Sequence, residues 1–356
     1  MNQEKISKIF IVLFMAIIIV PLACFILRIK IEPINKNDKK ISLNFARNFP
    51  LKSDLFDAFA VIKSDVFDTN PIPGRAIDMK NGWKFLGNDF SNALSESKGL
   101  VVFTKSELVK LKKSLENRQK WLNDRGIKFY VAIAPNKHSV YGDMIPIAKA
   151  SNNTKREQVD SICNVLGINY IDLGAKFPKN SKIRLYHRTD THWNDYGGFF
   201  AHESTMELIK KDFKDSKFNT FTLDDMDMRV TIDPIGDLNQ MLQLKKNEEY
   251  IRLDFKEPEQ AIQLEKQLQV PRDYHKNPLF YETRYKNDIN DLKVLVFNDS
   301  FFGYYSKYLK ENFGSSVFIW NYKFDKEIIE KEKPDILYHE ILERDVDFLI
   351  DNYIPR

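Results

Sequence analysis

The sequence predicts an α/β fold in which helices cover a mostly parallel β-sheet. Near-continuous apolar runs at residues 127–134 and 292–297 are typical of strands buried on both faces of such a sheet. Strand patterns also alternate with helical patterns, as at residues 105–125 and 154–166. Because 43% of the 356 residues are hydrophobic, the chain can bury a sizeable core.

The N-terminus contains one long apolar segment, residues 9–27, with basic residues on both sides. Nineteen helical residues span about 28 Å, close to the hydrocarbon thickness of a bilayer. We expect a short tail at 1–8, a transmembrane anchor at 9–27 and a stalk at 28–75. A cleaved signal peptide is the competing interpretation. The flanking positive charges, counted literally, put the large domain inside, but long translocated domains often override that count.

The rest of the chain, residues 76–356, is interpreted as one α/β domain. Asn81-Gly82 marks a hairpin turn next to a short strand. Residues 212–290 interrupt the alternation of strands and helices, and we expect an insertion or lid with irregular or antiparallel strands there. The other expected elements are helices at 105–125, 154–166, 197–211 and 301–312, and strands at 127–134, 168–173, 292–297, 317–320 and from 334 onward.

Charge and cysteine content exclude several classes of function. Lys and Arg number 54 and Asp and Glu 50, and this small excess is spread without a basic block or a zinc-finger spacing. The sequence therefore argues against nucleic-acid binding. Of the two cysteines, Cys24 lies in the apolar segment and cannot plausibly pair with Cys163. Neither a disulfide framework nor a Cys-rich zinc site is available.

Three polar clusters follow predicted strands, where open α/β sheets form their ligand sites: residues 134–138, 189–194 and 298–301. Ser300 lies where a buried strand turns into a helix, whose N-terminus favours developing negative charge. Asp190 and His192 are two residues apart and can point the same way from an extended segment. Asp190 can then hold one imidazole nitrogen while the other faces a serine, so the three form a possible Ser-His-Asp triad.

Other roles compete for the same residues. Ser300 and Asp299 are both common helix caps. Asp190 and His192 could be ordinary polar loop residues. His187, Asp190 and His192 could instead bind a metal ion, but their spacing is loose and no fourth ligand is evident, so we expect no metal.

Four motifs occur together in this chain: Asn-Gly-Trp-x-Phe at 81–85, Ala-Pro-Asn-Lys at 134–137, Thr-Asp-Thr-His-Trp-Asn at 189–194 and Asn-Asp-Ser-Phe at 298–301. Together they resemble the SGNH-hydrolase-like family of alginate O-acetyltransferases, the AlgJ and AlgX or DHHW proteins. Gly236-Asp237-Leu238 also resembles a feature of that family. The resemblance implies a three-layer SGNH-hydrolase-like sandwich and assigns the catalytic triad to Ser300, His192 and Asp190. It also implies a circular permutation, because the Asp-x-His element precedes the serine.

The resemblance further implies a membrane-anchored, extracytoplasmic polysaccharide O-acetyltransferase with an acetyl-serine intermediate and no cofactor. A membrane-bound O-acyltransferase would supply the acetyl group, and a polysaccharide would accept it. Two alternatives stay open. One is a carbohydrate acetylesterase with the same triad, and the other is a non-catalytic glycan-binding scaffold of an export complex.

The oxyanion hole departs from that of ordinary SGNH enzymes, because the segment after Pro334-Asp335-Ile336 lacks their Gly-x-Asn-Asp element. Four residues remain candidates for oxyanion or substrate binding: Asn136, Lys137, Asn298 and Arg344. Three aromatic residues near the triad segments are candidates to stack on sugar rings, although packing is the commoner role of such side chains: Tyr186, Trp193 and Tyr304.

Overall fold

The computed structural model describes residues 3–26, 58–60, 62–67, 69–178, 182–233 and 236–351. Two compact units are present, Met1–Pro71 with Leu242–Leu244, and Ile72–Met241 with Lys245–Arg356. In the first unit, α1 covers Gln3–Ile26 and a π-helical turn, η1, covers Ile62–Val66. Among the helices of the described ranges, none meets the length and hydropathy required of a membrane span. Most of the predicted stalk lies outside the described residues.

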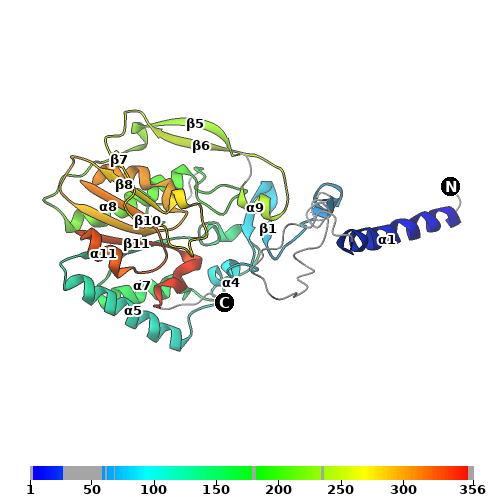
Figure 1. Cartoon of the computed structure of the whole chain (residues 1–356), viewed down its shortest axis with the longest axis horizontal. Coiled ribbons are helices and arrows are strands. Elements are labelled where there is room, and N and C mark those ends of the chain that lie inside the picture. The colour runs from blue at the N-terminus through cyan, green and yellow to red at the C-terminus, as the bar shows by residue number, and fades with distance from the viewer. Residues whose placement is uncertain are drawn as a thin grey trace. The chain divides into compact units, whose positions relative to one another are not determined.

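A seven-stranded mixed sheet forms the centre of the second unit (Figure 1). The first five strands in its spatial order are mutually parallel, the sixth is antiparallel to the fifth, and the seventh is antiparallel to the sixth. The predicted α/β class is therefore confirmed with a mixed sheet. The order is β4 (Asn169–Asp172), β3 (Lys128–Ala134), β11 (Ile336–Leu342), β9 (Lys293–Asn298), β10 (Ser315–Trp320), β8 (Glu282–Lys286) and β7 (Ile262–Leu264).

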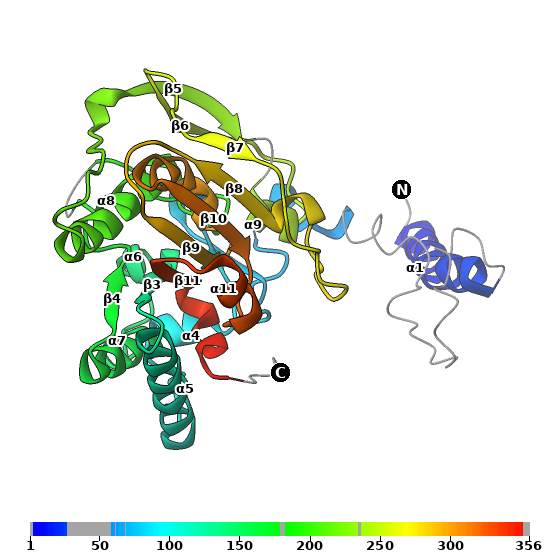
Figure 2. The same cartoon turned by 60° about the vertical axis from the view of Figure 1, so that its left-hand side comes forward.

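Helices cover both faces of this sheet, which gives three layers (Figures 1 and 2). One face carries α5 (Lys105–Asn123), α7 (Lys155–Leu166) and α11 (Lys326–Glu332), and the other carries α8 (Asp195–Asp212). The helix boundaries follow from local chemistry. Thr104, the N-cap residue, and Glu107 in the first turn form a capping box at the start of α5, and Gly167 ends α7 in the left-handed conformation, with φ 66°.

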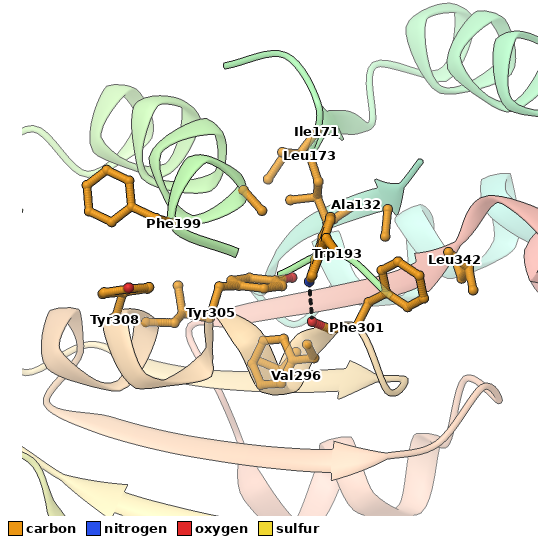
Figure 3. Close-up of a cluster of buried hydrophobic side chains, with 14 of the residues drawn as sticks. Ala132, Ile171, Leu173, Trp193, Phe199, Val296, Phe301, Tyr305, Tyr308 and Leu342 are labelled. Carbon is orange, nitrogen blue, oxygen red and sulfur yellow. Dashed lines mark hydrogen bonds between the residues drawn. The ribbon is translucent and has the colours of Figure 1, made fainter. Parts of the chain in front are cut away.

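The apolar strands divide their side chains between two cores. Along β3, Tyr130 and Ala132 pack in the cluster on the α8 side, whereas Val131 and Ile133 pack in the cluster on the α5 side. This two-residue alternation is the reason that the strand sequences are apolar throughout. Figure 3 shows the α8-side cluster around Trp193.

The region at 212–290 contributes two different structures. β5 (Met226–Asp233) and β6 (Glu248–Phe255) form a separate antiparallel ribbon, and α9 (Asp237–Met241) lies between them in the sequence. β7 and β8 instead pair with each other and, through β8, with β10 in the main sheet. The last two strands at one side of the central sheet, with β7 at its edge, therefore come from this region.

The predicted hairpin at Asn81-Gly82 is present: β1 (Ala76–Asp78) pairs with β2 (Lys84–Leu86), and both turn residues have positive φ. The helix expected at 301–312 is divided into three short pieces, and Gly303, a poor helix former, lies in the first. These pieces and the remaining short helices are η6 (Phe302–Tyr304), α10 (Ser306–Leu309), η7 (Lys310–Asn312), η2 (Lys80–Gly82), α4 (Ala93–Ser97), α6 (Lys137–Val140), η3 (Gly142–Met144), η4 (Leu223–Asp225), η5 (Pro278–Phe280) and η8 (Glu343–Leu349).

Candidate active site

Ser300 lies on the tight turn that follows β9, at the C-terminal edge of the sheet. The Asp299 carboxylate shapes this turn, because its oxygens accept the N–H groups of Phe301 at 2.8 Å and Leu342 at 2.7 Å. The Asp299 N–H donates to Glu340 Oε2 at 3.0 Å. Since Glu340 and Leu342 belong to β11, these bonds fasten the nucleophile turn to the neighbouring strand. The side chain of Ser300 stays partly exposed.

The two acids that hold the nucleophile turn, Asp299 and Glu340, differ in how readily they ionise. Burial raises the pKa of Asp299 to about 6, although its bonds to backbone N–H groups oppose the rise. Burial raises the pKa of Glu340 well above its usual range, and the nearby charge of Asp299 adds to the effect. The pair therefore favours the proton on Glu340, and Asp299 is the acceptor that holds the turn.

The loop at 187–192 carries the predicted acid and base. Its ends are joined by an antiparallel bridge between Tyr186 and Trp193. The buried Trp193 indole donates from Nε1 to the carbonyl of Phe301 at 2.9 Å (Figure 3). Because Phe301 directly follows Ser300, this bond ties the loop to the nucleophile turn.

The acid, the base and the serine form one continuous row of hydrogen bonds. Ser300 Oγ lies 2.7 Å from His192 Nε2, and His192 Nδ1 lies 2.6 Å from Asp190 Oδ1. The backbone N–H of His192 also donates to Asp190 Oδ1 at 2.9 Å, and that of Asp237 donates to Asp190 Oδ2 at 2.8 Å. An ionised Asp190 places the ring proton on Nδ1, which leaves Nε2 as the acceptor for the serine proton. The row thus has the geometry of a nucleophile, a general base and an orienting acid.

The electrostatics of the pair suit the same roles. Burial lowers the pKa of His192, but the hydrogen bond and charge of Asp190, helped by Asp237, outweigh burial and raise that pKa above its ordinary 6.5. Burial raises the pKa of Asp190, but its bonds to His192 and the histidine charge hold it well below the usual range. Asp190 is therefore ionised at neutral pH, and His192 is a stronger base than a free imidazole.

Two acidic residues outside the loop hold its backbone in place. Asp237 accepts the N–H of Thr191 at 2.7 Å and its hydroxyl at 2.5 Å. Glu248 accepts the N–H groups of Arg188 at 2.7 Å and Thr189 at 2.8 Å, and the Thr189 hydroxyl at 2.8 Å. These bonds fix the backbone on either side of Asp190 and before His192.

Sequence reasoning assigned no role to either supporting acid. For Asp237 a signal existed, because it follows Gly236 in a motif of the resembled family. A Cβ at Gly236 would lie 2.3 Å from the carbonyl oxygen of Thr189, so this approach requires glycine. For Glu248 no signal was available, because it is one of many acids in a charged region and only the fold brings it to the loop.

Lys137 is a buried residue whose ammonium group binds backbone carbonyl oxygens. Its buried Nζ donates to the carbonyl oxygens of Lys84 at 2.8 Å and Arg188 at 3.2 Å, and it lies 5.7 Å from the centre of the Trp83 ring. Burial lowers the pKa of Lys137 to about 7, which the acids around the loop partly oppose. Lys137 thus joins β2 to the loop that bears the triad acid and base.

The other predicted site residues lie at different depths. Tyr186 and Trp193 are completely buried, and Tyr186 Oη donates to the carbonyl of Pro135 at 2.5 Å, so their rings serve packing. Tyr304 borders the triad: its ring centre lies 6.1 Å from that of His192. Three more lie near strand ends at this edge of the sheet: Asn136 after β3, Asn298 at the end of β9 and Arg344 after β11.

Asp190, His192 and Asp237 each bring one potential metal-ligand atom within 4.8 Å of the others. These ligand atoms already have hydrogen-bond partners: Asp190 Oδ1 binds His192 Nδ1, and the carboxylates of Asp190 and Asp237 also accept backbone N–H groups. The arrangement is therefore accounted for as a hydrogen-bonded acid–base group. His187 lies outside this group and contacts Tyr304, with His187 Nε2 3.2 Å from the tyrosine hydroxyl.

Comparison with known families matches residues 80–286 to the SGNH hydrolase-like domain of the acetyltransferase AlgX. This match contains Asp190 and His192 and ends before Ser300. No curated protein sequence matched the chain.

Among solved structures, PatB1 from Bacillus cereus superposes with a TM-score of 0.56 at 15% identity, over 78% of this chain and 99% of that one. PatB1 with a sulfonyl adduct gives 0.53 at 15% identity, over 74% and 93%. A DHHW family protein from Eubacterium siraeum gives 0.52 at 10% identity, over 79% and 96%. At these identities the likeness concerns the fold.

Proposed function

The chain belongs to the family of SGNH hydrolase-like acetyltransferase domains represented by AlgX, and from this premise we propose that it is a polysaccharide O-acetyltransferase that works through an acetyl-serine at Ser300. The observation that carries the proposal is the hydrogen-bonded row from Ser300 Oγ through His192 to Asp190, with distances of 2.7 and 2.6 Å. A serine is a weak nucleophile unless an adjacent base takes its proton, and this row supplies the base.

In the first half-reaction, Ser300 Oγ attacks the carbonyl carbon of an acetyl donor while its proton moves to His192 Nε2. Asp190 stabilises the imidazolium through the bond to Nδ1. The carbonyl electron pair moves onto oxygen and then returns, which breaks the bond to the leaving group. The leaving group takes the proton from Nε2, and Ser300 carries the acetyl group.

In the second half-reaction, a sugar hydroxyl attacks the acetyl-serine carbonyl and gives its proton to His192 Nε2. The tetrahedral intermediate collapses, and Ser300 Oγ recovers that proton as it leaves. The same histidine therefore acts as base and acid in both halves, and no cofactor enters either step.

The proposal includes an extracytoplasmic location, with residues 9–27 as the membrane anchor and a membrane-bound O-acyltransferase as acetyl supplier. Its support is the apolar sequence of that segment and the helical conformation of α1 over Gln3–Ile26. Attachment of green fluorescent protein or of alkaline phosphatase at the C-terminus tests the orientation, because the phosphatase is active only outside the cytoplasm. Fluorescence without phosphatase activity would contradict the proposed location.

Hydrolysis is the second candidate function, and one observation favours it. The side chains of His192 and Asp190 are 21% and 16% exposed, so water can reach the base as an acceptor. The same row would then release acetate from an acetylated carbohydrate. A non-catalytic glycan-binding scaffold would instead show no acetyl-enzyme.

The test uses the full chain purified in detergent, treated with p-nitrophenyl acetate, with intact mass and peptide mapping as readouts. We expect one acetyl group on Ser300 and none in Ser300→Ala. Because PatB1 has been seen with a sulfonyl adduct, a sulfonyl fluoride should also label Ser300 and block acetylation. Added polysaccharide should then receive the acetyl group, whereas release as acetate alone would favour the esterase. A folded protein without any adduct would refute both catalytic functions.

A further inference from the structure

The four candidates for the oxyanion donor beside Ser300 differ in their burial and in the hydrogen bonds that their side chains already make. The Lys137 ammonium already donates to the carbonyl oxygens of Lys84 and Arg188 in the interior of the protein. Asn298 is 6% exposed, and its amide nitrogen faces the carbonyl of Val296 at 3.5 Å. Both residues are buried, Lys137 at 2% and Asn298 at 6% exposure, so neither offers an exposed donor to a substrate oxygen.

Asn136 is fixed from two sides. Its backbone N–H donates to Glu343 Oε2 at 2.7 Å, and its Oδ1 accepts from Arg344 Nη1 at 3.2 Å. Arginine only donates, so the amide oxygen must face Arg344. The residue is 1% exposed and its Nδ2 is shielded from solvent, so a substrate oxygen cannot reach that nitrogen. Asn136 therefore holds Arg344 and does not itself meet substrate.

Arg344 is the candidate with donors to spare. It is partly exposed, and its guanidinium carbon lies 5.8 Å from the centre of the Phe301 ring, on the residue next to Ser300. One N–H of Nη1 donates to Asn136, and the remaining N–H groups of the guanidinium have no hydrogen-bond acceptor within the described part of the chain. A fixed, partly solvated guanidinium thus stands beside the nucleophile turn.

The sheet explains this placement. β11 lies next to β9, and the Leu342 N–H at its end bonds to Asp299 in the nucleophile turn. Arg344 comes two residues later, on the first turn of η8. The Ser300 N–H likewise has no acceptor in the described ranges, which leaves it available to an oxygen bound in front of the serine.

We propose that Arg344, positioned by Asn136, joins the Ser300 N–H in forming the oxyanion hole. When Ser300 Oγ adds to the acetyl carbon, the carbonyl π pair becomes a negative charge on oxygen, and it returns to the C–O bond on collapse. A guanidinium is always charged and its fork is planar, so Arg344 would donate to this oxygen without gaining or losing a proton. This inference rests on the proposed function of the same site.

The test compares single-turnover acetylation of Ser300 in the full chain and in variants at Arg344. Removal of one oxyanion donor typically lowers the chemical rate by about 10²- to 10³-fold. We expect a loss of that size in Arg344→Gln, with little change in the p-nitrophenyl acetate concentration for half-maximal rate. Asn136→Ala should fall between this variant and wild type, because the guanidinium remains but is no longer fixed.

Arg344→Ala should recover activity when guanidinium or ethylguanidinium is added, a response that a merely structural role would not give. Arg125→Gln is the control, since Arg125 stacks on Trp121 in α5, away from the triad, and should acetylate at the wild-type rate. Wild-type rates in Arg344→Gln, or no rescue of a folded Arg344→Ala, would overturn the assignment of Arg344. If wild type itself never acetylates Ser300, the proposed function fails, and this inference fails with it.

Discussion

We expect the Glu248 carboxylate to contribute most to holding the loop that carries Asp190 and His192 in place. Its Oε1 accepts from Arg188 N–H at 2.7 Å and from Arg184 Nη1 at 3.0 Å. Its Oε2 accepts the N–H and the hydroxyl of Thr189, both at 2.8 Å. With only 6% of Glu248 exposed, water cannot replace these four donors readily if the acceptor is lost.

Glu248→Gln keeps the shape and removes one acceptor atom. The remaining oxygen can satisfy two of the four donors, and the Thr189 hydroxyl can reverse to accept from the new amide. One backbone N–H is then left facing another donor in a buried site. From the loss of a charge-assisted bond and the cost of one buried unpaired group, we expect a destabilisation of about 3 kcal/mol. At about 2–4 °C per kcal/mol for a domain of this size, the melting temperature should fall by roughly 6–12 °C.

The rate should fall as well, because the loop would no longer hold the imidazole at hydrogen-bond distance from Ser300. A misplacement of about 1 Å commonly costs up to 10²-fold in rate. The assays are urea unfolding followed by circular dichroism and single-turnover acetylation. Glu249→Gln is the matched control, because the neighbouring side chain is exposed and should change stability by less than about 0.5 kcal/mol. Equal midpoints and equal rates in the two variants would refute this reasoning about the loop.

Three further predictions follow from the titratable groups. The acetylation rate should rise with pH through the His192 pKa, which lies above 6.5. Asp190→Asn should move this rise to lower pH and slow the reaction by about 10⁴-fold. A rate that does not change between about pH 5 and 9 would contradict the role of His192 as the base. Glu340→Gln should change the unfolding midpoint little, because burial disfavours the charge of this acid and an amide oxygen can still accept the Asp299 N–H. Asp299→Asn should cost about 2–4 kcal/mol by weakening two buried bonds to backbone N–H groups, and equal melting curves for the two variants would disprove the difference. Because the pKa of Lys137 is lowered in the folded protein, the unfolded chain binds more protons than the folded chain between about pH 7 and 10.5. The stability of the protein should therefore increase with pH in that window. Lys137→Met should lack this increase when urea unfolding midpoints are compared at about pH 7 and 9.

Several elements could be predicted because their causes are local. The expected strand at 127–134 differs from β3 by one residue, since an apolar run between a helix stop and a polar cluster has few other uses. The hairpin at Asn81-Gly82 was equally visible, because a turn with two positive φ angles selects these residue types. By contrast, β7 and β8 could not be recognised as sheet strands. Their side chains are mixed in polarity, and their place at the sheet edge depends on pairing with β10.

The candidate site divides along the same line. Asp190 and His192 are two residues apart, so their partnership could be proposed from the sequence, and Ser300 could be added from its position after a buried strand. That the serine lies 2.7 Å from the imidazole, across 108 residues of chain, is a property of the fold. The sequence also left four oxyanion candidates equal. Only burial and hydrogen bonding separated Arg344 from the others.

By itself, then, the sequence determined the alternation of strands and helices, the apolar N-terminal segment and the residue types able to form an acid, a base and a nucleophile. Periodicity, turn chemistry and residue identity are written within short stretches of chain, which is why they are visible there. The tertiary structure decided which acids brace the catalytic loop, which strands close the sheet and which cation stands beside the serine. These depend on contacts between distant segments, and such contacts are set by strand order, register and packing.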